Sequence, residues 1–422
     1  MGVKKILIIS NAALSQTDSN GRNIARLLDC FSIQQKAQFF VYGEPDFNEC
    51  KDYYHISDKM AFLSLNRFKK IDGRVQESVK SIQNMARNKK HKKTPLKMII
   101  RELIWKFGSW RNHYFNEWID DIKPDCLLVV CGDNAFTLNI ANIISIRRNI
   151  PVILYSTEEY PFKDYNYVTK RPSIFYNIWK RIIDKAYKRI ENRVSVGVFN
   201  TNSLCELFDN RFSYKCCCIY QKTNIDWIEH SEIDNPKIVS YLGNLGLNRH
   251  KALIEIANSL AMVFPNLKLD VYGKMSKIVE QELLLCPNIR LCGFVEYNDV
   301  VKIIHNSTLL VHTEYDSEFF NRDLKYAFST KISDSVSSGT PLLIYANQNL
   351  AESVFLRKHK CAFVATTKEE LHLQIKQSLS DVASRRAILK EAYIARKEFF
   401  ERDDMFKTII EDIVYEKGTI RF

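Results

Sequence analysis

Glycines and cationic side chains alternate in one segment in a way that suits an anionic ligand. The run Tyr241–Lys251 reads as a strand, a glycine-bearing loop and the start of a helix. Gly246 would let the backbone approach a ligand, and Arg249 and Lys251 add cationic donors beside the unpaired N–H groups of a helix start. These features together suit a diphosphate. An ordinary turn between a strand and a helix, with cations on its surface, fits the same residues.

A second segment, Phe328–Pro341, places a lysine where a helix would normally avoid one. Ser329 or Thr330 can cap the helix, and Lys331 in the first turn opposes the helix dipole. This arrangement costs less if an anion binds there. Asp334 lies one turn further on and could accept a hydrogen bond from a ribose hydroxyl. The alternative is a capped helix with an exposed lysine.

The elements that must position these residues follow an α/β pattern. Short apolar runs alternate with longer helical patterns, which is typical of parallel sheets. The predicted strands of the first half are Lys5–Ser10, Gln38–Tyr42, Cys126–Cys131, Val152–Tyr155 and Val196–Asn200. Those of the second half are Ile238–Leu242, Lys268–Tyr272, Ile289–Cys292, Leu309–His312, Pro341–Ile344 and Ala362–Ala365.

The pattern restarts after the polar stretch Cys218–Lys237, which predicts two doubly wound domains rather than one long sheet. We expect an N-terminal domain over 1–220, a second domain over 221–385, and a helical tail, 386–422, that crosses back to the first. Two facing domains of this kind would place the carboxyl ends of their strands, and therefore a ligand, in a cleft between them.

The two cationic segments together resemble the C-terminal domain of GT-B fold glycosyltransferases, specifically the retaining, family 4-like enzymes. The resemblance covers roughly 238–371 and includes the landmarks Val271–Gly273 and Ile289–Val295. The Ser-Thr-Lys helix start followed by Asp is similar to a bacterial polysaccharide-synthesis subgroup. The resemblance implies two Rossmann-like domains and a UDP- or GDP-sugar as donor, with no separate cofactor.

Carried over residue by residue, the resemblance implies which side chains hold the donor. The implied diphosphate contacts are Gly246, Arg249, Lys251, Thr330 and Lys331. The ribose contact would fall on Asp334, and base stacking or backbone contacts on the region of Phe294 and Val295.

The sequence departs from the family at one of its acids. Typical members carry two glutamates eight positions apart before the small-Gly-x-Pro turn. Here Asp334 occupies the second position and Tyr326 the first. The missing acid must be absent or supplied from elsewhere, and Glu314 and Glu318 are the nearest candidates. We therefore expect Glu314 to be catalytic.

The first half offers three weaker candidate sites. In GT-B enzymes a flexible glycine loop after the first strand approaches donor phosphate and acceptor, which implies roles for Gly21 and Arg22. Asp133 follows a strand and could orient the acceptor or polarise its hydroxyl. In the pair Glu158–Glu159, beside an aromatic residue, we expect Glu158 to be the acid with a perturbed pKa. Plain loops between strands and helices fit these residues as well.

The positive charge is concentrated in one segment. The formal net charge is +12, and residues 67–112 carry 14 Lys or Arg against three acids, a net of +11. Apolar and aromatic residues interleave with these cations, which suits a helix lying on an anionic membrane. The alternative is a solvated basic loop followed by an ordinary helix that packs Trp105 and Trp110 inward. The remainder is near neutral, which excludes a nucleic-acid protein with basic surface throughout.

Several other classes of protein and site are excluded or not expected. No apolar run reaches about 18 residues, so we expect no membrane span, and we interpret the first ten residues as a strand rather than a secretory signal. We interpret the eleven cysteines as reduced thiols of a cytosolic protein. We interpret His312 as a core histidine, and no metal-ligand motif is present, so we expect no essential metal.

The function predicted from these observations is transfer of a sugar from a nucleotide-diphosphate-sugar to a glycan acceptor. We expect the acceptor to be lipid-linked and the protein to be cytoplasmic, peripheral on the inner face of the cell membrane. The resemblance adds that the reaction retains anomeric configuration. A nucleotide-sugar epimerase, a phosphorylase on the same fold, or a non-catalytic membrane- or glycan-binding scaffold are the alternatives.

Overall fold

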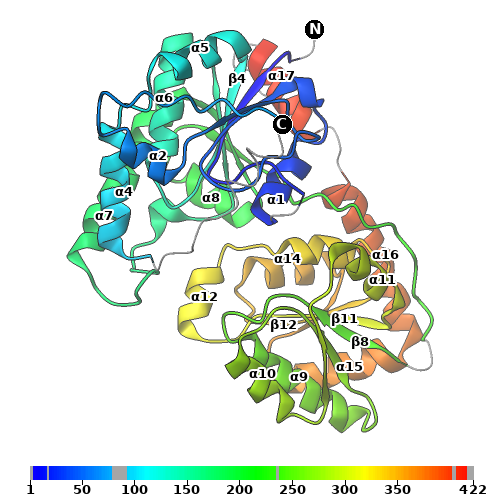
Figure 1. Ribbon diagram of the computed structural model, residues 1–422. Coiled ribbons are helices and arrows are strands. Elements are labelled where there is room, and N and C mark those ends of the chain that lie inside the picture. Colours follow the sequence, from blue (N-terminus) through cyan, green and yellow to red (C-terminus); the bar gives the residue numbers. More distant parts are fainter. Residues whose placement is uncertain (1–2, 17–18, 78–92, 234–236, 402–404, 416–422) are drawn as a thin grey trace. The chain divides into compact units, whose positions relative to one another are not determined.

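The computed structural model describes residues 3–16, 19–77, 93–233, 237–401 and 405–415. The chain divides into two compact units (Figure 1): Met1–Ile219 with Asp403–Phe422, and Tyr220–Arg402. We expected the second domain to end at 385. In the structure it continues to Arg402, because the helix at Val382–Ala395 and the turn Arg396–Phe400 pack on the second unit.

The first unit contains a seven-stranded, fully parallel sheet in the order β3-β2-β1-β4-β5-β6-β7. Its strands are β1 Ile6–Ile9, β2 Lys36–Phe40, β3 Asp52–His55, β4 Cys126–Val130, β5 Val152–Ser156, β6 Val194–Phe199 and β7 Lys215–Cys218. The central strands are almost continuously apolar because helices cover both faces of a parallel sheet.

The helices of the first unit follow the strands and, in one case, return from the far end of the sequence. They are α1 Ser19–Leu27, α2 Asp58–Leu63, α4 Pro95–Phe107, α5 His113–Ile122, α6 Phe136–Arg148, α7 Ile174–Ile190, α8 Asn202–Asp209 and α17 Met405–Tyr415. The last helix buries Phe406, Ile409, Ile410 and Ile413 in the same apolar cluster as Ile6 and Ile8 of β1. The core of the first unit is therefore built from both ends of the chain.

The second unit contains a six-stranded parallel sheet in the order β10-β9-β8-β11-β12-β13. Its strands are β8 Val239–Leu242, β9 Leu269–Tyr272, β10 Ile289–Gly293, β11 Leu309–Thr313, β12 Leu342–Tyr345 and β13 Phe363–Ala365. Its helices are α9 Arg249–Val263, α10 Lys277–Leu284, α11 Tyr297–Asn306, α12 Glu318–Leu324, α13 Thr330–Val336, α14 Ala351–His359, α15 Lys368–Ser380 and α16 Val382–Ala395.

The basic segment folds partly as an ordinary packed helix. Trp105 and Trp110 are 2% and 1% exposed. Trp105 donates to Asp58 at 2.7 Å and stacks on Phe136 with ring centres 4.2 Å apart. Of the two interpretations of this segment, the one in which Trp105 and Trp110 pack inward is therefore correct for these two residues. Residues 78–92 of this segment lie outside the described residues.

Two further features bear on the sequence predictions. Within the described ranges, no helix is both long enough and apolar enough to cross a membrane. All eleven cysteines are free thiols in the structure.

Candidate functional site

Two loops meet at the carboxyl ends of β8 and β9, and glycines make the approach possible. A Cβ at Gly273 would lie 1.9 Å from the carbonyl oxygen of Gly243, so any side chain there would push the loops apart. A Cβ at Gly243 would lie 2.8 Å from the Tyr241 hydroxyl and 3.2 Å from Cε of Lys331. The bare backbone of Gly243 thus leaves room for the stem of Lys331.

Arg249 is held rigidly beside this loop. Leu247 and Asn248 both adopt left-handed backbone conformations, and the turn they make starts α9 at Arg249. The guanidinium donates from Nε to Oε2 of Glu314 at 2.8 Å and from Nη2 to Oε1 at 2.6 Å. A third, longer bond of 3.3 Å runs from Nη1 to the carbonyl of Asn244. The planar cation is therefore fixed at three points.

Lys331 lies in the same place, on the first turn of α13. Burial of its ammonium group, with Arg249 as a nearby cation, lowers the pKa of Lys331, against the opposing effect of Glu314, Glu352 and Asp334. The predicted capping differs in detail: Ser329 is the N-cap residue, but its side chain makes no capping hydrogen bond. Two cations from different helices thus lie at one edge of the sheet.

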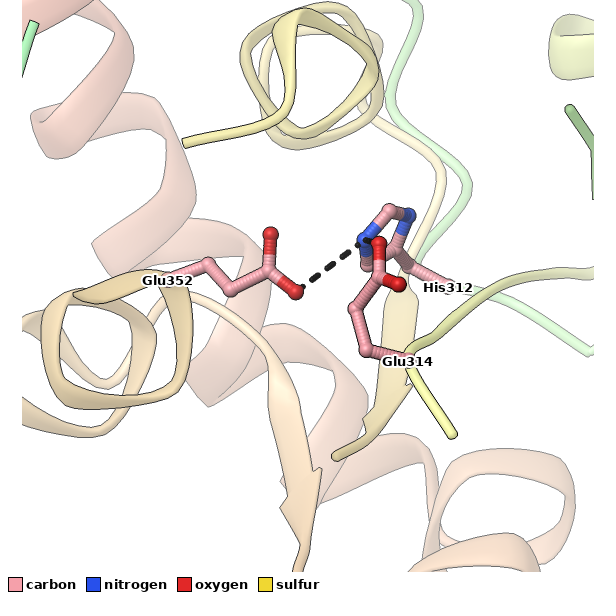
Figure 2. Close-up of side chains that lie close together, drawn as sticks. All are labelled: His312, Glu314 and Glu352. Carbon is pink, nitrogen blue, oxygen red and sulfur yellow. Dashed lines mark ion pairs between the residues drawn. The ribbon is translucent and has the colours of Figure 1, made fainter. Parts of the chain in front are cut away.

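Glu314 and two neighbours form a buried acidic group (Figure 2). His312 is the penultimate residue of β11, Glu314 follows the strand, and Glu352 lies in the first turn of α14. Nε2 of His312 is 3.3 Å from Oε1 of Glu352 and 3.8 Å from Oε1 of Glu314. Burial, together with the charge of Glu352, raises the pKa of Glu314 in spite of Arg249. His312 is buried, as a core histidine would be, yet it faces two acids.

These three residues could in principle hold a cation, since one ligand atom from each lies within 4.8 Å of the others. Histidine nitrogen and carboxylate oxygens are ligands for transition metals. However, Arg249 occupies both oxygens of Glu314. A metal ion at these three residues would therefore have to displace a guanidinium that is already paired with Glu314.

The remaining predicted donor residues are distributed around the same sheet edge. Asp334 accepts a hydrogen bond of 3.0 Å from Thr223, and Thr330 begins α13. The N–H of Gly246 is bonded to Oδ1 of Asn244 at 2.7 Å rather than exposed to a ligand.

Two side chains expected at the site pair with other groups. Lys251 is exposed, and its Nζ lies 5.7 Å from the centre of the Tyr315 ring. Phe294 is 53% exposed at the end of β10, with Nζ of Lys274 3.9 Å from its ring centre. One face of the Phe294 ring is therefore already in contact with the ammonium group of Lys274.

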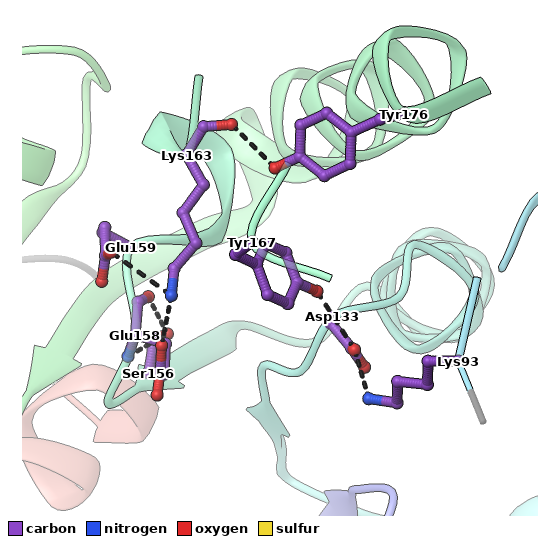
Figure 3. Close-up of polar contacts among 8 residues, drawn as sticks. All are labelled: Lys93, Asp133, Ser156, Glu158, Glu159, Lys163, Tyr167 and Tyr176. Atoms are coloured by element: carbon purple, nitrogen blue, oxygen red, sulfur yellow. Dashed lines mark hydrogen bonds and ion pairs between the residues drawn. The ribbon is translucent and has the colours of Figure 1, made fainter. Parts of the chain in front are cut away.

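In the first unit, the acids after β4 and β5 are engaged by neighbours (Figure 3). Asp133 accepts from the Tyr167 hydroxyl at 3.2 Å and pairs with Lys93. Lys163, 4% exposed, has its Nζ 2.8 Å from Glu158 and 3.4 Å from Glu159. This lysine joins the two acids on the loop after β5.

The acid with the perturbed pKa is not the expected one. Burial raises the pKa of Glu159 to about 7, although Lys163 opposes the shift. The prediction of Glu158 was wrong because Glu159 points into the protein, where it is 5% exposed. The sequence also gave no indication of Glu102 on α4, whose pKa burial raises to about 7 and which accepts from the N–H of Ala135 at 2.8 Å.

Gly21 and Arg22 do not lie in a flexible loop. Both belong to the first turns of α1, and Arg22 donates to the carbonyl of Gln16 at 2.9 Å. A Cβ at Gly21 would lie 2.3 Å from the carbonyl oxygen of Ala13. Glycine is required here because the helix start packs directly against the segment that follows β1.

A family comparison assigns the unit that carries Arg249 and Lys331. Residues 224–395 match the model of the family described as glycosyl transferases group 1. The second unit is a glycosyltransferase domain. The expectation of a glycosyltransferase is thereby confirmed, whereas the family 4-like and polysaccharide-synthesis assignments stay predictions. No curated protein matches the sequence.

Solved structures resemble the whole glycosyltransferase chain at low identity. Anabaena HepE in complex with UDP-glucose has 11% identity and a TM-score of 0.57, with 98% of each chain covered. WaaG, a glycosyltransferase involved in lipopolysaccharide biosynthesis, has 11% identity and a TM-score of 0.53, with 97% of this chain and 99% of that chain covered. A putative UDP-N-acetylglucosamine 2-epimerase from Listeria monocytogenes has 12% identity and a TM-score of 0.52, with 99% and 98% covered. The predicted GT-B architecture of two parallel-sheet domains is confirmed.

Proposed function

We propose that this glycosyltransferase moves a sugar from a UDP- or GDP-sugar to a hydroxyl of a lipid-linked glycan. One observation carries the proposal: Arg249 and Lys331, from the starts of two helices, lie together beside the Gly243 loop of the glycosyltransferase domain. Two converging cations in a largely buried setting are suited to a diphosphate.

The charge that develops during the reaction explains the need for two cations. The bond between the anomeric carbon and the diphosphate oxygen breaks, and the acceptor oxygen forms the new bond, so negative charge accumulates on the departing diphosphate. Lys331 and the outer edge of Arg249 would stabilise that charge. Thr330 would add a contact to phosphate, and Asp334 would accept a hydrogen bond from the ribose. Gly246 would contact phosphate only after its N–H leaves Asn244. Phe294 would contact the base only with the ring face that Lys274 leaves open.

The two-point pairing with Arg249 suggests a different role for Glu314 from the one expected. Because both of its oxygens receive hydrogen bonds from the guanidinium, we propose that Glu314 orients Arg249 and does not itself contact the sugar. Lys251 would help only if the loop moves its side chain away from Tyr315.

We assign acceptor binding to the first unit. Asp133 would orient the acceptor hydroxyl, and Glu158, the more exposed acid of its pair, would bind sugar hydroxyls. Carboxylates flanked by Tyr160 and Tyr167 offer both hydrogen-bond acceptors and apolar ring faces, which suits a sugar.

The experiment that tests the proposal measures nucleotide release from a panel of UDP- and GDP-sugars, with and without lipid-linked glycan acceptors. We expect one nucleotide to raise the thermal midpoint and its sugar conjugate to release nucleotide only with an acceptor. If no nucleotide stabilises the chain and none is released, the proposal fails. Both oxygens of Glu314 already accept hydrogen bonds from Arg249 rather than binding a metal ion. Nucleotide release should therefore continue in the presence of a chelator.

A nucleotide-sugar epimerase is the second candidate, favoured by His312, Glu314 and Glu352 in the donor-binding unit. Epimerisation needs acids or bases around the sugar and no acceptor. Incubating donor alone and analysing the sugar separates the two candidates. An isomerised sugar would support the epimerase, and unchanged donor would support the transferase.

A further inference from the structure

The helix α4 leaves an apolar face uncovered although its tryptophan face is buried. Leu96, Ile100, Leu103 and Phe107 are 44%, 45%, 44% and 65% exposed. Their spacing of four, three and four residues places them along one side of the helix. The opposite side buries Met98 and Trp105. The helix is thus apolar on two sides, and only one of them is used by the fold.

The neighbouring helices extend this apolar surface. The helices α2 and α7 both contact α4, and Figure 1 shows the three within the first unit. At the start of α7, Ile174, Phe175 and Ile178 are 78%, 48% and 40% exposed. In and after α2, Phe62 and Leu65 are 57% and 42% exposed. Exposed apolar groups of this density mark an interaction surface rather than scattered surface residues.

Cations accompany the apolar groups. Phe68, 96% exposed, stands in the sequence Arg67-Phe68-Lys69-Lys70, of which all four residues are exposed. On α4 the exposed cations are Lys97 and Lys106, whereas its one acid, Glu102, is buried. Ring and aliphatic groups flanked by lysines match a surface with an apolar interior and anionic head groups.

We propose that the apolar faces of α4 and of the start of α7, with the Arg67–Lys70 turn, form a docking surface for an anionic lipid bilayer. The charge complementarity argues for lipid and against a second copy of the chain, which would bring the same cations together. The proposal rests on the proposed function only in that a lipid-linked acceptor would be reached at the same membrane.

Flotation of the full chain with lipid vesicles tests this surface. We expect binding to phosphatidylglycerol vesicles, weakened by salt and by Lys69→Gln/Lys70→Gln, and little binding to phosphatidylcholine. The variant Leu103→Ser/Phe107→Ser should reduce the bound fraction at least tenfold with an unchanged thermal midpoint. The matched control Leu284→Ser/Leu285→Ser, at positions 67% and 84% exposed in the second unit, should bind as the parent does.

Three results would overturn the inference. They are no flotation of the parent chain, equal flotation of the parent and the α4 variant, and a dimer of the parent that the α4 variant dissociates. The test is independent of the proposed function, because stabilisation by nucleotide is measured on the same samples. Vesicle binding without nucleotide binding would remove the transferase proposal and leave the membrane surface standing.

Discussion

Arg249 and Glu314 form a two-point ion pair at the carboxyl end of β11, with the carboxylate 5% exposed. The pairing fixes the plane of the guanidinium before any donor arrives. A cation that is already oriented loses less side-chain freedom when it binds a phosphate. The same pairing has a cost, because each partner is needed to neutralise the other away from water.

Removing one partner of this pair should destabilise the second unit more than removing both. We expect Arg249→Ala to lower the free energy of unfolding by about 3 kcal/mol, because a buried carboxylate is left unpaired. Arg249→Ala/Glu314→Gln should recover a clear part of that loss. Urea unfolding measures both, with Lys302→Ala, an exposed pair with Asp299, as control. A loss for Arg249→Ala no larger than the control would contradict the argument.

Lys331→Ala should reduce turnover about a hundredfold, which corresponds to about 2.7 kcal/mol of transition-state stabilisation. The thermal midpoint should change little, because burial of the ammonium group and the like charge of Arg249 offset its attraction to the nearby carboxylates. Steady-state rates with saturating donor test this, again with Lys302→Ala as control. Turnover within twofold of the parent would remove Lys331 from the site.

As pH rises, kcat/KM for the donor should begin to fall at a lower pH than the titration of an ordinary lysine would produce. The pKa of Lys331 is lowered by burial and by Arg249, so its positive charge is lost as pH rises through that lowered value. Arginine keeps its charge over this range. In Lys331→Arg the basic limb of kcat/KM for the donor should therefore move to higher pH. Identical limbs in the two proteins would assign the titration to another group.

Glu102 should penalise stability at neutral and higher pH. Its folded-state pKa is raised to about 7 from 4.5, so the folded chain holds the proton more tightly than the unfolded chain does. The penalty is absent below the unfolded value, grows between the two values and reaches about 3 kcal/mol above them.

The variant Glu102→Gln isolates this effect, because the amide oxygen can still accept from Ala135. We expect it to stabilise the chain relative to the parent at pH 8 by about 3 kcal/mol and to differ little at pH 4.5. Unfolding in urea at both pH values measures the difference, and Glu117→Gln, at an exposed position of α5, is the control. A difference that does not change with pH would rule out the buried acid as its source.

The sheets could be predicted from apolar runs wherever a strand is covered on both faces. All six strands of the second unit were expected, and Val152–Tyr155 differs from β5 by a single residue. In the first unit β3 and β7 were missed. Both are edge strands. Asp52–His55 has a polar residue at each end and Lys215–Cys218 is a lysine followed by three cysteines, so no long apolar run marks either strand.

The site could be predicted less completely, because it depends on which side chains meet. The nearness of Arg249 and Lys331 followed from strand order, since both follow parallel strands at the same sheet edge. Glu352 was missed, although an acid in the first turn of a helix after β12 would fall at that edge too. The pairing of Arg249 with Glu314 required the left-handed turn at Leu247 and Asn248. Asparagine is common in that conformation, but leucine gives no indication of it.

The return of α17 to the first unit has a consequence for biosynthesis. Phe406, Ile409, Ile410 and Ile413 complete the apolar cluster around β1, yet they are made after the entire second unit. A ribosome-bound chain would hold the first sheet with one side of its interior still open to water. The half of the enzyme that is translated first must therefore be the last to mature, and chaperones would meet it in that unfinished form.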